Sequence, residues 1–496
     1  TILHLLQTYR DLNCTVRSTS GHLKSVGFWL GLISILFSLI IQNPIGLSTE
    51  GRLTLAVFSL MGIWWAFEAL PLQVTALMPL VLFPLLGVVE IGVISKEYMN
   101  KVQFLFAGGF IIAIAIQKWG LHKRVALNIL RLSGLNANGI VASFMLASAL
   151  LSMWVMNTST AIMLLPVAIS VIKVITDTVK EIDDNQSYNF QLCLLLGIAY
   201  SASLGGIATP IGTSPNGVLI QFAADNFNKD IGFANWIAFG LPVTIILGPL
   251  VWYLLTKFIY PVNFKASINA KAELETMLSE LGAMTNEEKK VVIVFTFTAF
   301  CWIFRQVLDD LPGLSLLDDS VIAMIGGLSL FFINRKDNKE KLLEWEDAQN
   351  GFPWGLIFLF GGGMALAYVV NDSGLALWLA SLIPSQTYFF IVLFIVITMV
   401  ILLTELTSNL TTTVTFLPVV ASVGLNLGID PMLLILPLTL SASCAFMLPV
   451  ATPPNSIVYA SGLIPIQKMV KAGIIINLLS IIFLFVLAYF FIPTLI

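Results

Sequence analysis

The sequence predicts an all-α polytopic membrane protein built from two copies of one module in opposite orientations. Two observations carry this prediction. First, 57% of the 496 residues are hydrophobic and only 11% are charged, with a mean hydropathy of +0.92, whereas soluble domains carry about a quarter charged residues. Second, three sequence blocks of the first half recur in the same order in the second half, with a different distribution of basic residues.

The apolar runs predict about 11 transmembrane helices, because a helix needs roughly 20 residues to cross a bilayer and fewer where interfacial groups flank it. The runs lie near residues 26–42, 52–67, 72–89, 103–118, 191–208, 236–260, 291–307, 319–334, 354–371, 430–448 and 473–493. Two further regions, 137–172 and 386–429, each contain two apolar arms around a polar tip. Each of them is either a re-entrant hairpin or a pair of full spans, and both alternatives return the chain to the same side.

The lysine and arginine residues predict a cytoplasmic N-terminus, because cytoplasmic loops are richer in these residues. Arg10, Arg17 and Lys24 precede the first run. With 11 crossings, the other basic loops also face the cytoplasm: 118–131, 173–180, 257–290, 335–341 and 468–471. The loops left outside hold few basic residues or none: 43–51, 90–102, 221–235, 308–318 and 372–386.

The composition does not indicate an enzyme or a nucleic-acid-binding protein. The sequence has no basic patch with interleaved aromatic residues. Its four cysteines and three histidines are scattered, so they predict neither a disulfide framework nor a metal site. No set of nucleophile, base and metal ligands is apparent. We therefore expect no enzymatic activity and no cofactor apart from a coupling ion.

The internal repeat consists of three blocks. Residues 105–110 (LFAGGF) recur at 359–364 (LFGGGM), residues 156–160 (MNTST) at 408–412 (SNLTT), and residues 210–216 (PIGTSPN) at 449–455 (PVATPPN). Lys118, Lys123, Arg124 and Arg131 follow the first block, but no lysine or arginine occurs from Leu342 to Gln467. Matched segments with opposite basic content should face opposite sides of the membrane. This is an inverted-topology repeat, the architecture of secondary transporters, whose site lies between the repeats near the midplane.

Glycines and prolines in these blocks predict local structure. The pair Gly108-Gly109 and the run 361–363 indicate close packing of helices. The prolines at 449, 453 and 454 cannot sustain a helix, so the span around 430–463 should be broken within the membrane. Unwound backbone is tolerated there only where it lines a cavity or is buried in protein.

The predicted site has no lysine or arginine to neutralise an anion. Residues 132–172 and 189–224 contain no charged residue, and Glu405 is the only ionisable residue from 384 to 429. Helix N-termini, amides and hydroxyls can still hold carboxylate oxygens, and carbonyl and amide oxygens suit Na⁺, by analogy with other hard cations. A dianion would gain from co-bound cations. Glu405 is either a proton or cation group or a structural carboxylate, and we favour the structural role.

These residues resemble the divalent anion/sodium symporters, which carry di- and tricarboxylates. The resemblance rests on Trp64–Pro71, on the segment from Ser443 to Val458 and on the two polar tips. It implies a homodimer in the plasma (inner) membrane, with two re-entrant hairpins and an elevator-type mechanism. The implied boundaries are a scaffold of residues 1–132 and 291–384, a transport domain of residues 133–261 and 385–496, and a cytoplasmic linker at 262–290. The hairpins are then 137–172 and 386–429, and the broken helices 191–220 and 430–463.

The resemblance also implies which residues bind. The substrate residues would be Asn157, Thr158, Thr213, Ser408, Asn409 and Thr452. The sodium sites would be Ser152, Asn157 and Gly212 in one half, and Thr404, Thr407, Asn409 and Ala451 in the other. Met156 and Leu410 depart from the Ser-Asn-Thr pattern of the family's tips, and the loss of a charge-assisted hydrogen bond costs roughly 1.5–3 kcal/mol.

We therefore expect secondary transport of C4 or C5 dicarboxylates such as succinate, malate, fumarate or 2-oxoglutarate. Because Met156 and Leu410 remove hydroxyl groups, we favour sodium-independent exchange. One alternative is a Na⁺-coupled di- or tricarboxylate symporter. The more distant alternative is a cation/proton antiporter that uses Glu405.

Overall fold

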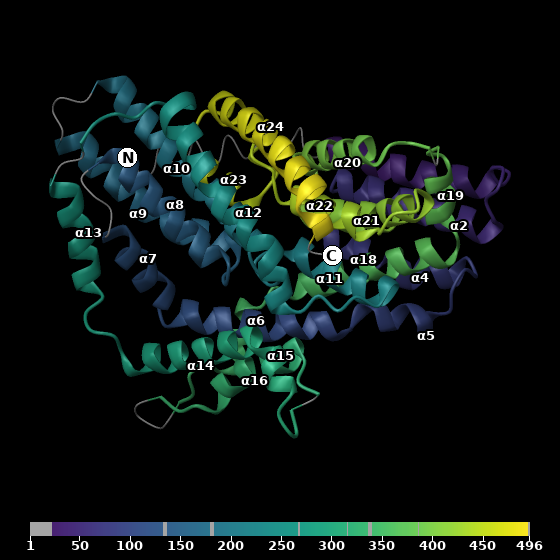
Figure 1. Cartoon of the computed structure of the whole chain (residues 1–496), viewed down its shortest axis with the longest axis horizontal. Coiled ribbons are helices and arrows are strands. Elements are labelled where there is room, and N and C mark those ends of the chain that lie inside the picture. The colour runs from purple at the N-terminus through teal and green to yellow at the C-terminus, as the bar shows by residue number, and fades with distance from the viewer. Residues whose placement is uncertain are drawn as a thin grey trace. The chain divides into compact units, whose positions relative to one another are not determined.

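The computed structural model describes residues 22–494 except 132–135, 179–182, 266–267, 315, 336–339 and 385. Over these residues the regular structure is helical and contains no strand, only isolated bridges. The prediction of an all-α membrane protein is confirmed, since several of the helices are long and apolar enough to span a bilayer (Figure 1). Arg10 and Arg17, on which the N-terminal orientation depends, lie outside the described residues. The chain divides into two compact units.

The first unit contains residues 1–100, 354–387 and 411–431. Its helices are His22–Ile40, α2 (Thr49–Ala66), α3 (Leu72–Ala76), α4 (Met78–Leu85), α5 (Ile91–Ile94), η1 (Ser95–Tyr98), α18 (Trp354–Asp372), α19 (Leu375–Ser381) and most of α21 (Asn409–Asn426). The run 72–89, predicted as one span, is two helices that meet at Leu77. Pro79 explains this interruption, because proline lacks the N–H that a continuous helix needs.

The glycine run of α18 allows close helix packing, as the sequence predicts. A β-carbon added at Gly362 would lie 2.0 Å from the Ala76 carbonyl oxygen, and one at Gly361 would lie 2.6 Å from the Tyr98 Cα. The Tyr98 hydroxyl donates a hydrogen bond of 2.5 Å to the same Ala76 oxygen. The helix α18 therefore contacts α3 and η1 almost backbone to backbone.

The second unit contains residues 101–353, 388–410 and 432–496. Its helices are α6 (Lys101–Lys118), α7 (Leu121–Arg131), α8 (Ala137–Ser152), α9 (Asn157–Thr178), α10 (Asp184–Ile207), α11 (Ser214–Phe227), α12 (Phe233–Tyr253) with the π-helical η2 (Leu254–Ile259), α13 (Ile268–Glu280), α14 (Asn286–Ile303), α15 (Arg305–Asp309), α16 (Asp319–Phe332), α17 (Trp345–Gly351), α20 (Phe389–Thr404), α22 (Met432–Ala442), α23 (Pro453–Ala460), α24 (Ile466–Phe490) and η3 (Ile492–Thr494). The segment predicted as a linker, 262–290, contains α13 and the first turn of α14.

Both predicted hairpins consist of two helices around a short polar turn. The first is α8 and α9, and the second is α20 and α21. The leading arms α8 and α20 have 16 residues each, fewer than the roughly 20 needed to cross. The trailing arms α9 and α21 have 22 and 18 residues, and α9 is long and apolar enough to cross a bilayer, so only the leading arms are shorter than a full span.

Both broken helices lie where the proline blocks predict them. The first break, residues 208–213, separates α10 from α11, and the second, residues 443–452, separates α22 from α23. The halves pack crosswise, since α23 contacts α9 and α10 while α11 contacts α22. The rings of Tyr200 on α10 and Phe446 in the second break lie 5.1 Å apart. The second unit thus contains both breaks in one packed assembly.

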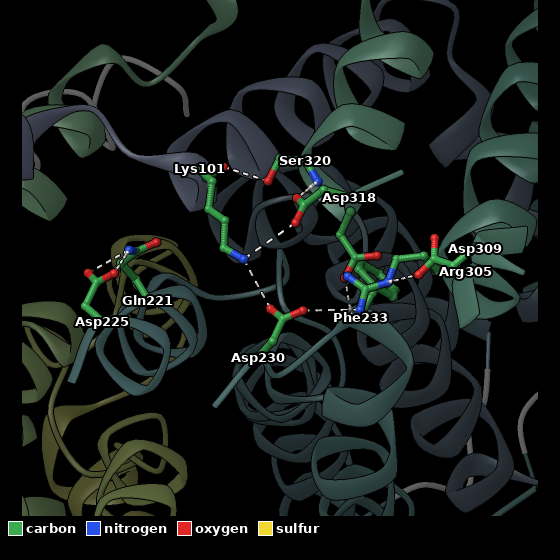
Figure 2. A network of polar contacts seen from close by, with 10 residues as sticks. Lys101, Gln221, Asp225, Asp230, Phe233, Arg305, Asp309, Asp318 and Ser320 are labelled. Atoms are coloured by element: carbon green, nitrogen blue, oxygen red, sulfur yellow. Dashed lines mark hydrogen bonds and ion pairs between the residues drawn. The ribbon is translucent and has the colours of Figure 1, made fainter. Parts of the chain in front are cut away.

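Polar contacts join α6, α15, α16 and the α11–α12 loop at one end of this unit (Figure 2). Lys101 lies 3.2 Å from Asp230 and 3.5 Å from Asp318. Arg305 pairs with Asp230 at 3.3 Å and with Asp319 at 3.4 Å. Asp230, Asp318 and Asp319 thus neutralise two basic residues, Lys101 and Arg305. Both lie at or near loops that the sequence analysis predicts on the outer side of the membrane.

Candidate functional site

The first tip brings together the oxygen atoms of Ser152, Asn157 and Gly212. The Ser152 hydroxyl donates a hydrogen bond of 2.5 Å to Asn157 Oδ1. A β-carbon added at Gly206 would lie 2.9 Å from this Oδ1 atom and 3.1 Å from the Gly212 carbonyl oxygen. The absence of a side chain at Gly206 therefore lets the tip and the first break approach one another. These are the three residues that the family resemblance implies for the first sodium site.

The first break is held by two polar side chains. Asn216, fully buried, donates from Nδ2 to the carbonyl oxygens of Gly206 at 3.0 Å and Thr209 at 2.8 Å. The Thr209 hydroxyl donates to the Met153 carbonyl oxygen at 2.5 Å. The carbonyl oxygens of Gly206 and Thr209 at the break, and that of Met153 at the tip, are thus satisfied inside the protein, as buried polar groups require.

The second tip repeats the bond of the first. The Thr404 hydroxyl lies 2.8 Å from Asn409 Oδ1 and 2.8 Å from the Ala442 carbonyl oxygen. Thr404 and Asn409 are five residues apart, as are Ser152 and Asn157. Thr407 donates to the Leu403 carbonyl oxygen at 3.0 Å. The predicted residue Ala451 is buried in the second break.

Glu405 binds the second break directly. Its carboxylate accepts hydrogen bonds from the backbone N–H groups of Phe446 at 2.7 Å, Met447 at 2.9 Å and Leu448 at 2.9 Å. It also accepts one from Asn477 Nδ2 at 2.7 Å. Four donors satisfy a buried carboxylate, so this geometry supports the structural role of Glu405 over the role of a proton or cation carrier.

Asn455 repeats the role of Asn216. It is fully buried, and its Nδ2 atom donates to the carbonyl oxygens of Ala445 at 3.2 Å and Leu448 at 3.1 Å. Among the described atoms, the Oδ1 atoms of Asn216 and Asn455 are buried without a hydrogen-bond partner. Sequence reasoning used both motifs as helix breakers but did not assign this role to the asparagines. It missed Asn477 altogether, whose signal is an amide in the apolar helix α24.

Four helices begin at or directly after predicted site residues. Asn157 opens α9 and Asn409 opens α21. Thr213 and Thr452 are the N-caps of α11 and α23. Unpaired N–H groups and the helix dipole make such termini favourable for anions. The side chains of Thr158 and Ser408 are partly exposed at the tips.

The two departures from the family's tip pattern differ in burial. Leu410 is 3% exposed and packs into the protein, whereas its counterpart Thr158 is partly exposed. Met156 is also partly exposed. The missing hydroxyl at 410 is therefore lost from a buried position, and the one at 156 from a partly exposed one.

A comparison with protein families identifies the chain. The model described as "Sodium:sulfate symporter transmembrane region" matches residues 24–496. The chain belongs to this family. The match confirms the resemblance to the divalent anion/sodium symporters. Members of the family are membrane transporters and not enzymes, in agreement with the sequence analysis.

Two similar curated proteins are both named sodium-dependent dicarboxylate transporter SdcS. The one from Staphylococcus saprophyticus is 39% identical over 476 residues, 94% of this chain and 91% of the relative. The one from Staphylococcus aureus is 37% identical over 475 residues, with the same coverage. These relatives do not support our expectation of sodium-independent exchange, and the sodium-coupled alternative fits them better.

Two solved structures share the fold. The YdaH transporter of Alcanivorax borkumensis has a TM-score of 0.58 at 14% identity, covering 88% of this chain and 98% of that one. Neisseria gonorrhoeae MtrF, from a class of antimetabolite efflux pumps, has a TM-score of 0.56 at 11% identity, covering 96% and 94%. At these identities the likeness shows the architecture alone.

Proposed function

We propose that this protein carries C4 or C5 dicarboxylates, such as succinate, malate, fumarate or 2-oxoglutarate, across the plasma membrane together with Na⁺. The observation that carries the proposal is the paired geometry of the tips. Each tip contains an asparagine whose Oδ1 accepts a hydroxyl hydrogen bond, Ser152 to Asn157 and Thr404 to Asn409. The names of the similar staphylococcal proteins support both the substrate class and the coupling ion.

The chemistry of the residues suits two kinds of cargo. Hydroxyl, amide and carbonyl oxygens are the ligands that hard cations prefer, and in the first half Ser152, Asn157 and Gly212 supply all three. The substrate carboxylates would bind Thr158, Ser408 and the N-termini capped by Thr213 and Thr452. Because no lysine or arginine is available at the tips, bound Na⁺ would supply the positive charge that a dianion needs. Substrate and cation binding would then reinforce one another.

In this proposal transport follows an elevator mechanism in a homodimer. Residues 133–261 and 385–496 move as the transport domain against a scaffold of residues 1–132 and 291–384. The N-terminus and the linker 262–290 face the cytoplasm. The proposal treats 137–172 and 386–429 as re-entrant hairpins, in keeping with the 16-residue arms α8 and α20.

Uptake into proteoliposomes tests the coupling. Purified protein is reconstituted without internal substrate, and entry of labelled succinate is measured with an inward Na⁺ gradient or with choline in place of Na⁺. We expect uptake that follows the Na⁺ gradient. Uptake that requires internal dicarboxylate and ignores Na⁺ would instead establish an exchanger.

Alanine variants test the site. We expect Asn157→Ala and Asn409→Ala each to reduce Na⁺-driven succinate uptake at least tenfold, because each loses an amide from a tip. Asn128→Ala is the matched control, since Asn128 is exposed on α7 and its amide donates to the Arg124 carbonyl oxygen. Wild-type uptake by both tip variants would overturn the site assignment.

A further inference from the structure

A cavity of about 580 Å³ lies between α7, α9 and α13. Most of its wall is apolar and includes Ala126 and Leu130 of α7, Met163 and Val167 of α9, and Met277 of α13. Figure 1 shows α7 and α13 side by side in this part of the second unit. Its volume is within the range of about 300–1,000 Å³ that is usual for ligand sites.

The cavity is polar and basic where α6 meets α7, because Gln117, His122 and Lys123 line it there. Ser159 of α9 is a further polar residue of the lining. Lys123 is exposed and forms no ion pair with any side chain that the structure describes. Burial lowers the pKa of His122, against the opposing effect of its hydrogen bond to the Ile116 carbonyl, so the Lys123 ammonium is the positive charge in this part of the lining.

The surrounding helix resembles one that lies at a membrane surface. The helix α7 contains Lys123, Arg124 and Arg131 and no acidic residue, and its apolar side chains Leu127 and Leu130 are buried. Because this apolar face packs inside the protein, the exposed basic side chains Lys123 and Arg131 are the groups of α7 that suit an anionic membrane surface. On the sequence-based orientation this helix faces the cytoplasm, where the anionic lipids are concentrated.

We propose that the cavity binds an acyl chain of an anionic phospholipid of the cytoplasmic leaflet, with its headgroup beside Lys123. The apolar wall suits a hydrocarbon chain, and the free ammonium at the rim suits a phosphate. A dicarboxylate suits the cavity poorly, because burying carboxylates against apolar side chains without partners is costly. The nearby acidic residues of α13 with described side chains, Glu275 and Glu280, are exposed and do not line the cavity. The lining includes Ser159, which follows Thr158 of the proposed substrate site, but the test below measures lipid labelling and not uptake.

Photo-crosslinking tests the proposal. The full chain is reconstituted in liposomes with phosphatidylglycerol carrying a diazirine in one acyl chain, and the labelled residues are mapped by mass spectrometry. We expect labelling at Met163 and Met277. Met163→Trp, which fills the cavity, should reduce labelling at Met277 at least fivefold. Ile169→Trp is the matched control, because Ile169 is exposed on the same helix and does not line the cavity.

The role of the Lys123 charge is tested separately. Diazirine-labelled phosphatidylcholine should label the cavity less than phosphatidylglycerol does, and Lys123→Gln should remove this difference while Arg131→Gln keeps it. Labelling confined to lipid-facing helices and unchanged by Met163→Trp would overturn the proposal. So would labelling of the cavity by a free diazirine fatty acid but not by the phospholipid. Monodisperse elution of each variant in size-exclusion chromatography establishes that it is folded.

Discussion

Met153 and Glu405 occupy equivalent positions in the two repeats, and each accepts hydrogen bonds from the adjacent helix break, Met153 through its backbone and Glu405 through its side chain. Each lies four residues before its tip asparagine. Met153 accepts a hydrogen bond at its carbonyl oxygen from the Thr209 side chain, whereas the Glu405 side chain accepts three from backbone N–H groups of residues 446–448. In both halves the break donates and the hairpin accepts. The side chain in the bond belongs to the break in the first half and to the hairpin in the second.

We expect Glu405→Gln to destabilise the protein by about 2–3 kcal/mol, because hydrogen bonds to charged groups contribute about 1.5–3 kcal/mol and the new amide N–H₂ would face backbone donors. The melting temperature in detergent, followed by loss of the monodisperse peak in size-exclusion chromatography, measures the effect. Glu346→Gln is the control, because Glu346 is exposed in α17. A Glu405→Gln variant of unchanged stability that has lost its Na⁺ dependence would instead support the ion-carrier role.

The positions of both breaks follow from the sequence, but their supports do not. Prolines at 210, 449, 453 and 454 lack the backbone N–H that a helix needs. They lie in the matched blocks 210–216 and 449–455, so they predict a break in each of the two matched spans. Asn477 could not be assigned in this way. It lies 72 residues from Glu405, in a helix with no motif, and only tertiary packing brings the two side chains together. The interruption at Leu77 was missed because the apolar run 72–89 continues through Pro79.

The repeat predicts the tip geometry better than any single motif does. Once residues 156–160 are matched to 408–412, the pairs Ser152–Asn157 and Thr404–Asn409 fall five residues apart in both copies. Matching the repeats does not predict which tip side chains are buried. Thr158 and Leu410 are equivalent by position, yet Leu410 is buried and Thr158 is partly exposed. Sequence matching gives each tip residue a partner but not the direction of its side chain.

We expect Ser152→Ala and Thr404→Val to weaken sodium binding while the fold remains intact. Each removes one hydroxyl that holds a tip asparagine, and a hydrogen bond contributes about 1 kcal/mol, which is about a fivefold change in the Na⁺ concentration for half-maximal uptake. Na⁺ titration of succinate uptake measures this. Ser143→Ala is the control, since the Ser143 hydroxyl donates to Gly139 of its own helix. An unchanged Na⁺ dependence in both variants would exclude these hydroxyls from the cation sites.

We expect Gly206→Ala to abolish most transport, because its new methyl group would lie 2.9 Å from Asn157 Oδ1 and 3.1 Å from the Gly212 carbonyl oxygen. The contact of 2.9 Å is shorter than β-carbons make in real structures, so the tip asparagine must move, and the contact of 3.1 Å is tight. Gly248→Ala in α12 is the matched control, as a β-carbon there meets no atom within 4 Å. Succinate uptake at equal reconstituted protein measures both. Full activity of Gly206→Ala would show that the separation of tip and break is not critical.

We expect Asp319→Asn to destabilise the end of the unit shown in Figure 2 by about 1–2 kcal/mol. Asp319 pairs with Arg305 at 3.4 Å and accepts the Phe233 N–H at 2.7 Å, and its side chain is 9% exposed. The asparagine keeps the acceptor but loses the charge. Asp309→Asn should cost much less, because that pair is longer, 3.9 Å, and 35% exposed at the carboxylate. Melting temperatures compare the two, and equal losses would contradict this account.

The ion pair between Arg124 and Glu288 should make the stability of the C-terminal end of the linker depend on pH. Arg124 Nε lies 2.9 Å from Glu288, and its other nitrogens donate to the carbonyl oxygens of Leu281 and Gly282. Burial opposes ionisation of Glu288, but hydrogen bonds from Arg124 and Thr285 outweigh it and hold the pKa below its ordinary 4.5. Since the folded pKa is lower than the unfolded one, the stabilisation is complete above about pH 4.5 and is lost as the pH falls through the folded pKa.

We therefore expect the difference in melting temperature between the wild type and Glu288→Gln to be constant near neutral pH and to shrink below about pH 4.5. Glu280→Gln is the control, because Glu280 is exposed and forms no ion pair among the described residues. It should differ little from the wild type at any pH. A wild-type advantage over Glu288→Gln that persists to low pH would show that packing, and not the charge of Glu288, holds α7 to the start of α14.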